Sequence, residues 1–450
     1  MDALPSLPTL PRRLPLVGHV LSYVRDPFAF FVRASQLGPF ARVDLAGMRA
    51  VMVNDPDLVE AICVTQNRSF HKDRFAKDLQ RVLGMGLLTS DGDFWRRQRR
   101  LAQPAFHRER IAAYAKTMVE LTRAAADRWR EGEVRDAHAD MMELTLAIVG
   151  KTLFGAELGP RAHEIGAALE AVTAYYADPV AMTVPRWERL PTPLNRRFTA
   201  AVRRLDAIVR DLLRTHRAGT TGDGNDLLSM LLAARDEDGT GMSDDQLRDE
   251  AITILLAGHE TTAIALTFTW MLLAEHGGPG GARARLEAEI DEVLGDRDPT
   301  VADVPRLVFA DRIVRESMRL YPPAWSIGRE AAEDVEVGGR RFPRGTWFWF
   351  LPWTMHRDAR FFADPARFDP DRWEGDFAKS LPRFAYFPFG GGPRQCIGNS
   401  FATMETILCL VTIAQRWRLD LAGRRTVDLL PSVTLRPKHG LKVRLAQRPR

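Results

Sequence analysis

The segment FPFGGGPRQCIGNSFATMET, from Phe387 to Thr406, carries the most specific pattern in this sequence. A run of glycines, Gly390–Gly392, precedes Cys396, and a helix-like segment follows it. Glycines let the chain turn sharply with its amides directed inward. A helix that begins just after a cysteine lowers the pKa of the thiol through its N-terminal amides and dipole. The segment therefore predicts a loop that holds Cys396 as a thiolate, which is the form of cysteine that ligates iron.

Five positions of this loop are constrained within ten residues, in the pattern Phe389-x-x-Gly392-x-Arg394-x-Cys396-x-Gly398. Phe389 can cover the sulfur, Arg394 can reach an anionic group on a ligand, and Gly398 leaves space for a flat macrocycle. A glycine-rich loop that merely contains a buried cysteine is the alternative, but such a loop does not need all five residues. The pattern resembles the heme-binding signature of the cytochrome P-450 family. The resemblance implies heme b (iron protoporphyrin IX) with Cys396 as its axial iron ligand.

A second motif, Ala257-Gly258-His259-Glu260-Thr261-Thr262, lies about 140 residues before the cysteine. It resembles the oxygen-activation motif of the same family. Ala257 and Gly258 would leave room between the helix and the iron. Thr261 can open the helix by hydrogen-bonding to its own backbone, and Glu260 beside it can relay protons. The resemblance implies that Glu260 and Thr261 are the catalytic residues.

A third pattern, Glu316-x-x-Arg319, would be an ordinary helical ion pair if it stood alone. It is followed by Phe368-x-Pro-Asp-Arg372-Trp, and the two together resemble the structural ion-pair motif of the family. We therefore expect a network of Glu316, Arg319 and Arg372 that braces the fold around the cofactor and does no chemistry.

Four donors resemble the groups that contact the heme propionates. Trp95 and Arg99 are four residues apart, so a helix places both on one face. Arg329 and Arg394 match further propionate-binding positions in the family. Each arginine alone would more often lie at the surface, but the set favours cofactor binding.

The substrate pocket is expected from segments that correspond by position to the family's substrate-contacting regions. These segments are largely apolar, which indicates an apolar small molecule such as a fatty acid or terpenoid. Core residues share this composition. The pocket residues expected are Ile254, Trp325, Ile327 and Val433, with the stretches Phe75–Leu88 and Val172–Leu190.

The periodicity of apolar residues predicts a mostly α (α+β) fold, a single large helical domain over residues 1–450 with minor β-sheets. A short proline-rich segment, 1–17, opens the chain. The expected helices are Ile111–Glu131, Met141–Phe154, Arg161–Tyr176, Pro193–Thr215, Asp226–Arg235, Arg283–Leu294 and about Asn399–Arg416, with a long central helix capped by Ser243. The expected strands are Phe40–Leu45, Arg49–Val53, Glu333–Val337, Gly339–Phe342 and Thr346–Phe350, with a strand-rich tail over Leu429–Leu445.

Composition limits the remaining function classes. The formal net charge is +5, and no basic stripe interleaved with aromatic residues indicates nucleic-acid binding. Three cysteines without CxxC spacing argue against a disulfide framework or structural zinc, so Cys63 and Cys409 are expected to be core thiols. The N-terminus lacks the pattern of a signal peptide or an anchor. His259 and Glu260 interrupt the apolar region Ala251–Ala274, so we expect a buried helix there, no integral membrane segment and a cytoplasmic protein.

The resemblance covers essentially the whole chain and implies a heme-thiolate monooxygenase that uses O2. We expect no fused reductase, so electrons would come from a separate ferredoxin or flavodoxin with its reductase. Arg96, Arg97 and Arg100 could form a docking face for such an acidic protein, or simply a solvated helix face. A heme-thiolate isomerase or dehydratase, and a non-catalytic heme sensor or carrier, are the alternative functions. The motif with Glu260 and Thr261 argues against both.

Overall fold

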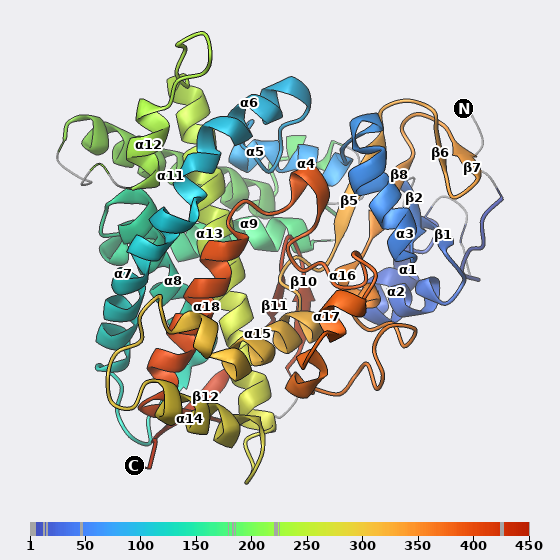
Figure 1. Ribbon diagram of the computed structural model, residues 1–450. Coiled ribbons are helices and arrows are strands. Elements are labelled where there is room, and N and C mark those ends of the chain that lie inside the picture. The colour runs from blue at the N-terminus through green and yellow to red at the C-terminus, as the bar shows by residue number, and fades with distance from the viewer. Residues whose placement is uncertain are drawn as a thin grey trace.

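The computed structural model describes residues 6–11, 14, 17–45, 48–178, 180–181, 184, 186–219, 224, 226–423 and 427–449. Parts of the proline-rich segment 1–17 and of the stretch Val172–Leu190 fall outside these residues. The described residues form a mostly helical structure with small β-sheets, as the sequence predicts. In Figure 1 the blue and orange strands gather at one side of the molecule, and the long helices fill the other side.

The central element is α13, Asp244–Glu275, which packs against α8 (Ala137–Phe154), α15 (Val308–Leu320) and α18 (Asn399–Ala414). It begins in a capping box, because the Ser243 side chain accepts from the amide of Gln246 and the Gln246 side chain accepts from the amide of Ser243. Among the described residues, only this helix is long and apolar enough to cross a membrane, and 78% of its most apolar window is buried inside the protein. Burial by neighbouring helices explains its apolar composition, as predicted.

Six further helices complete the helical side. They are α6 (Gly92–Ala102), α7 (Arg108–Ala126), α9 (Ala162–Ala177), α11 (Pro193–Arg217), α12 (Leu227–Ala233) and α14 (Ala282–Val293). The prediction of a helix up to Glu131 was wrong at its end, since α7 stops at Ala126. The chain then turns at Gly132, which has a φ of 78° and donates its N–H to the carbonyl of Leu445. The shorter helices are α1 (Val20–Arg25), α2 (Pro27–Ser35), α3 (Pro56–Glu60), α4 (Arg74–Asp78), α5 (Gln80–Leu83), α16 (Pro352–Met355) and α17 (Phe377–Ser380).

The largest sheet has the strand order β1-β2-β8-β5-β3, in which only the β2–β8 pair is parallel. A second sheet has the order β4-β12-β9, and two hairpins pair β6 with β7 and β10 with β11. The strands β3, β4, β5 and β9 were not predicted. The bounds are β1 Phe40–Leu45, β2 Met48–Val53, β3 Phe70–Lys72, β4 Val134–Asp136, β5 Ile327–Ala331, β6 Val335–Val337, β7 Arg340–Phe342, β8 Trp347–Phe350, β9 Trp417–Leu421, β10 Leu429–Pro431, β11 Leu435–Pro437 and β12 Lys442–Gln447.

Candidate active site

The loop before α18 turns where its glycines allow it. Gly392 has a φ of 69°, and a Cβ added to it would overlap the backbone carbonyl of Cys63. A Cβ on Gly391 would meet the ring of Phe384. The turn is closed by the amide of Cys396, which donates to the carbonyl of Phe389 at 2.9 Å. Glycine is therefore required at position 392 both for backbone conformation and for close approach.

Cys396 is exposed to a cavity whose wall includes its side chain. Burial raises the pKa of the thiol above its ordinary value, and a hydrogen bond from the Gly398 amide and the charge of Arg99 offset part of this rise. Arg99 also fixes the loop, because its Nη1 donates to the carbonyl of Gln395 at 2.8 Å. The site thus provides an amide and a cation that favour the thiolate.

The cavity has a volume of about 980 Å³ and extends from Cys396 to the face of α13. Ala257 and Thr261 line it from that helix, and Ala257 is exposed although most of α13 is buried. The expected pocket residues Ile254, Trp325, Ile327 and Val433 all lie in its wall. So do parts of the stretches Phe75–Leu88 and Val172–Leu190.

Gly258 lies in the wall of the cavity, where it was expected, and it has a second role. A Cβ at this position would meet Val149 of α8 at 3.3 Å, so the glycine also lets α13 and α8 pack closely. Ala257, the other small residue of the motif, is exposed to the cavity.

The four expected propionate-binding residues lie in the wall of the same cavity as Cys396. The guanidinium of Arg394 stacks on Trp95 at 4.0 Å from the ring centroid, and its Nη1 donates to the carbonyl of Ser90 at 2.7 Å. Arg394 also pairs with Asp91. Arg329 is 9% exposed and donates to the carbonyl of Gly328 at 2.8 Å. A cluster of cations at one end of an apolar cavity suits a ligand that carries carboxylates.

Lys72 is a further cation of this cluster that sequence reasoning missed. It lies on β3 and lines the cavity, and burial together with Arg329 and Arg394 lowers its pKa to about 7. An anionic group bound nearby would raise that pKa again. A single lysine in a three-residue strand gives no local signal in the sequence.

These residues fit a heme. They supply a thiol for the iron, cations for two carboxylates and apolar walls for the ring. Gly398 also fits, because it has open space beside it for a flat ring. A Cβ at this position would meet only Phe106, at 3.7 Å. Among the described residues, no cluster of His, Cys, Asp and Glu could hold a metal ion instead.

Glu260 and Thr261 are each held by specific hydrogen-bond partners. The Thr261 hydroxyl donates to the carbonyl of Ala257 at 2.8 Å within α13. The Glu260 carboxylate accepts a hydrogen bond from Thr434 and pairs with Arg436. Burial raises the pKa of Glu260, but Arg436 and Thr434 outweigh burial, so the net shift is downward. Glu260 is therefore an ionised carboxylate in a buried setting.

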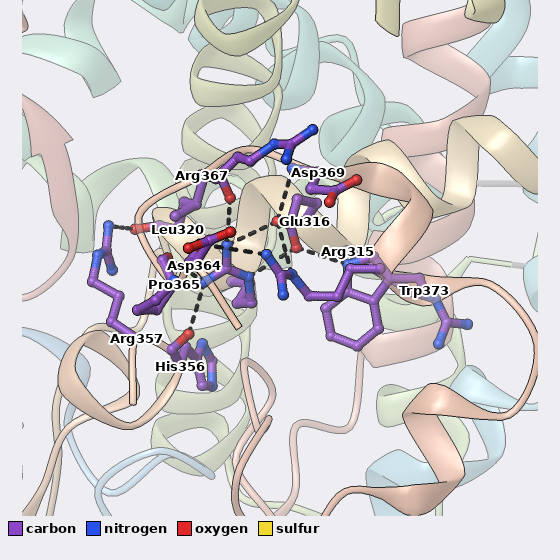
Figure 2. Close-up of polar contacts among 12 residues, drawn as sticks. Arg315, Glu316, Leu320, His356, Arg357, Asp364, Pro365, Arg367, Asp369 and Trp373 are labelled. Carbon is purple, nitrogen blue, oxygen red and sulfur yellow. Dashed lines mark hydrogen bonds and ion pairs between the residues drawn. The ribbon is translucent and has the colours of Figure 1, made fainter. Parts of the chain in front are cut away.

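The structure brings Glu316, Arg319 and Arg372 together outside the cavity. Arg319 donates to both oxygens of Glu316 at 2.8 Å, and Arg372 donates to one of them at 3.4 Å. Both members of the central pair are fully buried. Figure 2 shows that Trp373 and the amide of Asp369 also donate to Glu316, at 2.9 and 3.0 Å.

Arg319 extends this network to backbone carbonyls. It donates to the carbonyls of His356, Pro365 and Arg367, at 2.9, 2.7 and 2.9 Å. Figure 2 labels these three acceptor residues. One buried guanidinium thus fixes α15 to the irregular chain that follows α16. None of the three network residues lines the cavity, so their contribution is structural.

The other predicted residues lie away from this centre. Cys63 and Cys409 are buried, as expected of core thiols. The basic side chains of α6 are partly neutralised, because Arg96 pairs with Asp93, Arg97 with Asp236 and Arg100 with Glu237. A docking face there would therefore carry less net positive charge than the sequence run indicates.

Comparison with known proteins agrees with this geometry. The chain matches the cytochrome P-450 family over residues 8–444. It is 39% identical to cyclooctatin synthase of Streptomyces melanosporofaciens, over 91% of this chain and 89% of the relative. It is 36% identical to pentalenene oxygenase of Streptomyces avermitilis, over 98% and 97% of the two chains.

A solved structure extends the agreement to three dimensions. The crystal structure of the cytochrome P450DA heme domain superposes with a TM-score of 0.87, at 29% identity, and covers 100% of this chain and 99% of that one. The matches thus extend over nearly the whole chain, including the cysteine loop and the distal helix. The chain belongs to the cytochrome P-450 family and is a heme-thiolate monooxygenase.

Proposed function

We propose that this protein oxygenates a cyclic terpenoid, using heme b bound through Cys396. The observation that carries the proposal is the cavity, which joins the thiol at one end to a predominantly apolar wall. Ile254, Ile327 and Val433 offer aliphatic surface, and Trp325 offers an aromatic face. Such a wall binds a rigid hydrocarbon by burying its surface, with few polar groups to orient it.

The relatives support this substrate class. Their names include pentalenene and cyclooctat-9-en-7-ol, which are terpenoids, as substrates of oxygenases. A fatty acid would also bury its chain in such a cavity, but its carboxylate needs a cation away from the heme carboxylates. Arg74, Lys77 and Arg186 also line the cavity, and Lys77 pairs with Glu330. The substrates in the relatives' names therefore favour the terpenoid.

The bound heme supplies O2 activation and oxygen insertion. The chain contributes the Cys396 thiolate and a proton route through Thr261 and Glu260. The Thr261 hydroxyl lies at the cavity wall, where it can pass protons inward, and the adjacent ionised carboxylate of Glu260 can accept protons from water and pass them on to Thr261. Trp95, Arg99, Arg329, Arg394 and Lys72 would hold the two heme carboxylates.

Electrons would be delivered by a separate ferredoxin or flavodoxin with its reductase, in the cytoplasm. The side chains of Arg96 and Arg100 are at least half-exposed although each has an acidic partner. Acidic side chains of a bound protein could therefore replace Asp93 and Glu237 in these ion pairs. This docking would weaken with rising salt, because the pairs are at the surface.

Titration of the purified ferric protein with pentalenene and, in parallel, with palmitate tests the substrate class. Displacement of water from the iron by a bound substrate changes the spin state, which the absorption spectrum reports. We expect a shift with pentalenene and a weaker one or none with palmitate. Val433→Phe should weaken the pentalenene shift by filling the cavity, whereas Val301→Phe, at an exposed site, should not. A full shift with palmitate alone would overturn the terpenoid proposal.

A further inference from the structure

The turn between β10 and β11 contacts both the substrate cavity and the carboxylate of Glu260. Val433 lies in the cavity wall, and its neighbour Thr434 donates to Glu260. Two residues further, Arg436 pairs with the same oxygen of Glu260. A single short hairpin therefore contacts the space for substrate and the group that supplies protons.

This turn is firmly anchored. The hydroxyl of Ser432 donates to the carbonyl of Thr173 on α9 at 3.1 Å, and its own carbonyl accepts from the indole of Trp325 at 2.9 Å. The amide of Leu435 donates to the carbonyl of Pro323 at 2.9 Å. Because Trp325 also lines the cavity, a molecule that pushes on this wall acts on the turn that holds Glu260.

We propose that Arg436 is a positioning residue for the reaction, which with Thr434 fixes the Glu260 carboxylate beside Thr261 and couples its position to occupancy of the cavity. The inference rests on the proposed proton route through Glu260. Nothing in the local sequence marks Arg436, because its role depends on contact with Glu260, which lies 176 residues earlier in the chain.

The other charged and titratable groups that face Glu260 do not replace Arg436. His138, at the start of α8, has its pKa lowered to about 4 by burial and by Arg436, against the opposing effects of Asp136 and Glu260. Burial also lowers the pKa of His259, whose Nδ1 lies 2.9 Å from the carbonyl of Leu255. Both imidazoles are therefore neutral near neutral pH. Arg436 is then the permanent cation among the described groups that act on Glu260.

Removal of this cation has a definite consequence. Burial would act on Glu260 without opposition from Arg436, so the pKa of the carboxyl would rise and protonation would extend toward neutral pH. A protonated Glu260 could not accept the next proton from water, so coupled turnover would fall at low pH and recover as pH rises. In the wild type the pKa is lowered, so coupling should be flat over the same range.

Arg436→Gln, Arg436→Lys and the control Arg418→Gln test the inference in the holoenzyme. Arg418 is a partly exposed arginine that pairs with Glu287 on α14 and does not line the cavity. The measurement is the fraction of NADH consumption that yields product, from about pH 6 to about pH 9, with the substrate that gives the largest spin shift. We expect a roughly tenfold loss of coupling at low pH for Arg436→Gln, part of the roughly 10²–10⁴-fold that proton transfer contributes. Substrate affinity from the spin shift should stay within about twofold.

Arg436→Lys should restore most of the coupling, and Arg418→Gln should match the wild type. Arg436→Gln placed in a Glu260→Gln background should add no further loss and no pH dependence. Equal losses with and without Glu260, or an unchanged pH profile in Arg436→Gln, would overturn the inference. A failed spin shift with terpenoids in the wild type would instead overturn the proposed substrate class, and unimpaired coupling in Glu260→Gln would overturn the proton route.

Discussion

Glu316→Gln tests the buried network that holds α15 to the chain after α16. The substitution keeps the shape of the side chain and removes its charge, leaving Arg319 without a counter-charge where both residues are fully buried. It also replaces one acceptor oxygen by an NH2 group, which cannot accept from Arg319 or, depending on the oxygen replaced, from Trp373 or the amide of Asp369. Removing one partner of a buried pair costs about 3–5 kcal/mol.

That loss is large compared with the free energy of unfolding of a typical protein, which is roughly 5–15 kcal/mol. The entropy of unfolding for a chain of 450 residues is about 0.9 kcal/mol per kelvin, so the midpoint of thermal unfolding should fall by about 3–5 °C. Denaturant unfolding of the holoenzyme, followed by far-UV circular dichroism and by the heme absorption band, measures the free energy directly.

Glu374→Gln is the matched control. Glu374 is an acid whose side chain is 70% exposed and lies 3.6 Å from Arg312, so its loss should cost at most about 1 kcal/mol. If Glu316→Gln were destabilised no more than Glu374→Gln, the network would not brace the fold and the reasoning from burial would be refuted.

Three further predictions follow from single residues. Thr261→Ala should divert O2 and NADH consumption from product to peroxide by roughly tenfold or more, since it removes the hydroxyl at the cavity wall. Thr269→Ala, at a buried threonine of the same helix, should leave coupling unchanged, and unchanged coupling in Thr261→Ala would contradict the proposed proton relay. Burial raises the pKa of Glu250 to about 8, so the folded state holds a proton that the unfolded state releases near pH 4.5. The free energy of unfolding should therefore fall by up to about 1.4 kcal/mol per pH unit between pH 4.5 and about pH 8. Glu250→Gln should remove this slope in denaturant titrations at several pH values, and a slope that persists would contradict the assignment. Gly392→Ala should lose far more stability and heme content than Gly375→Ala. Both glycines have positive φ, but only a Cβ at position 392 would meet backbone atoms, those of Cys63. Equal losses in the two variants would mean that this close approach is unimportant.

The long helices could be predicted because their apolar periodicity is local. Ser243 marks the start of α13 through its own capping box, and Pro193 marks the first residue of α11. The strands β3 and β4 have only three residues each, and β3 pairs with β5 from a distant part of the chain. No window around Phe70 contains that information, so these strands could not be found from the pattern.

The residues of the candidate site also differ in whether the local sequence identifies them. Cys396, Glu260 and Glu316 stand in dense local motifs, and family resemblance identified them. Lys72 and Arg436 are isolated residues in short strands, and their importance arises only when the fold places them beside Arg329 and Glu260. Gly258 combines the two cases, since the motif indicated its place at the cavity, while its close approach to Val149 is seen only in the fold.

Turnover under ¹⁸O₂ tests the central claim most directly. The holoenzyme, supplied with a ferredoxin system and the terpenoid that gives the largest spin shift, should form a product that carries one labelled oxygen atom from O2. The Cys396→Ser variant should form none, because the thiolate is lost. A product without label, or with oxygen derived from water, would contradict the assignment of this chain as a terpenoid monooxygenase.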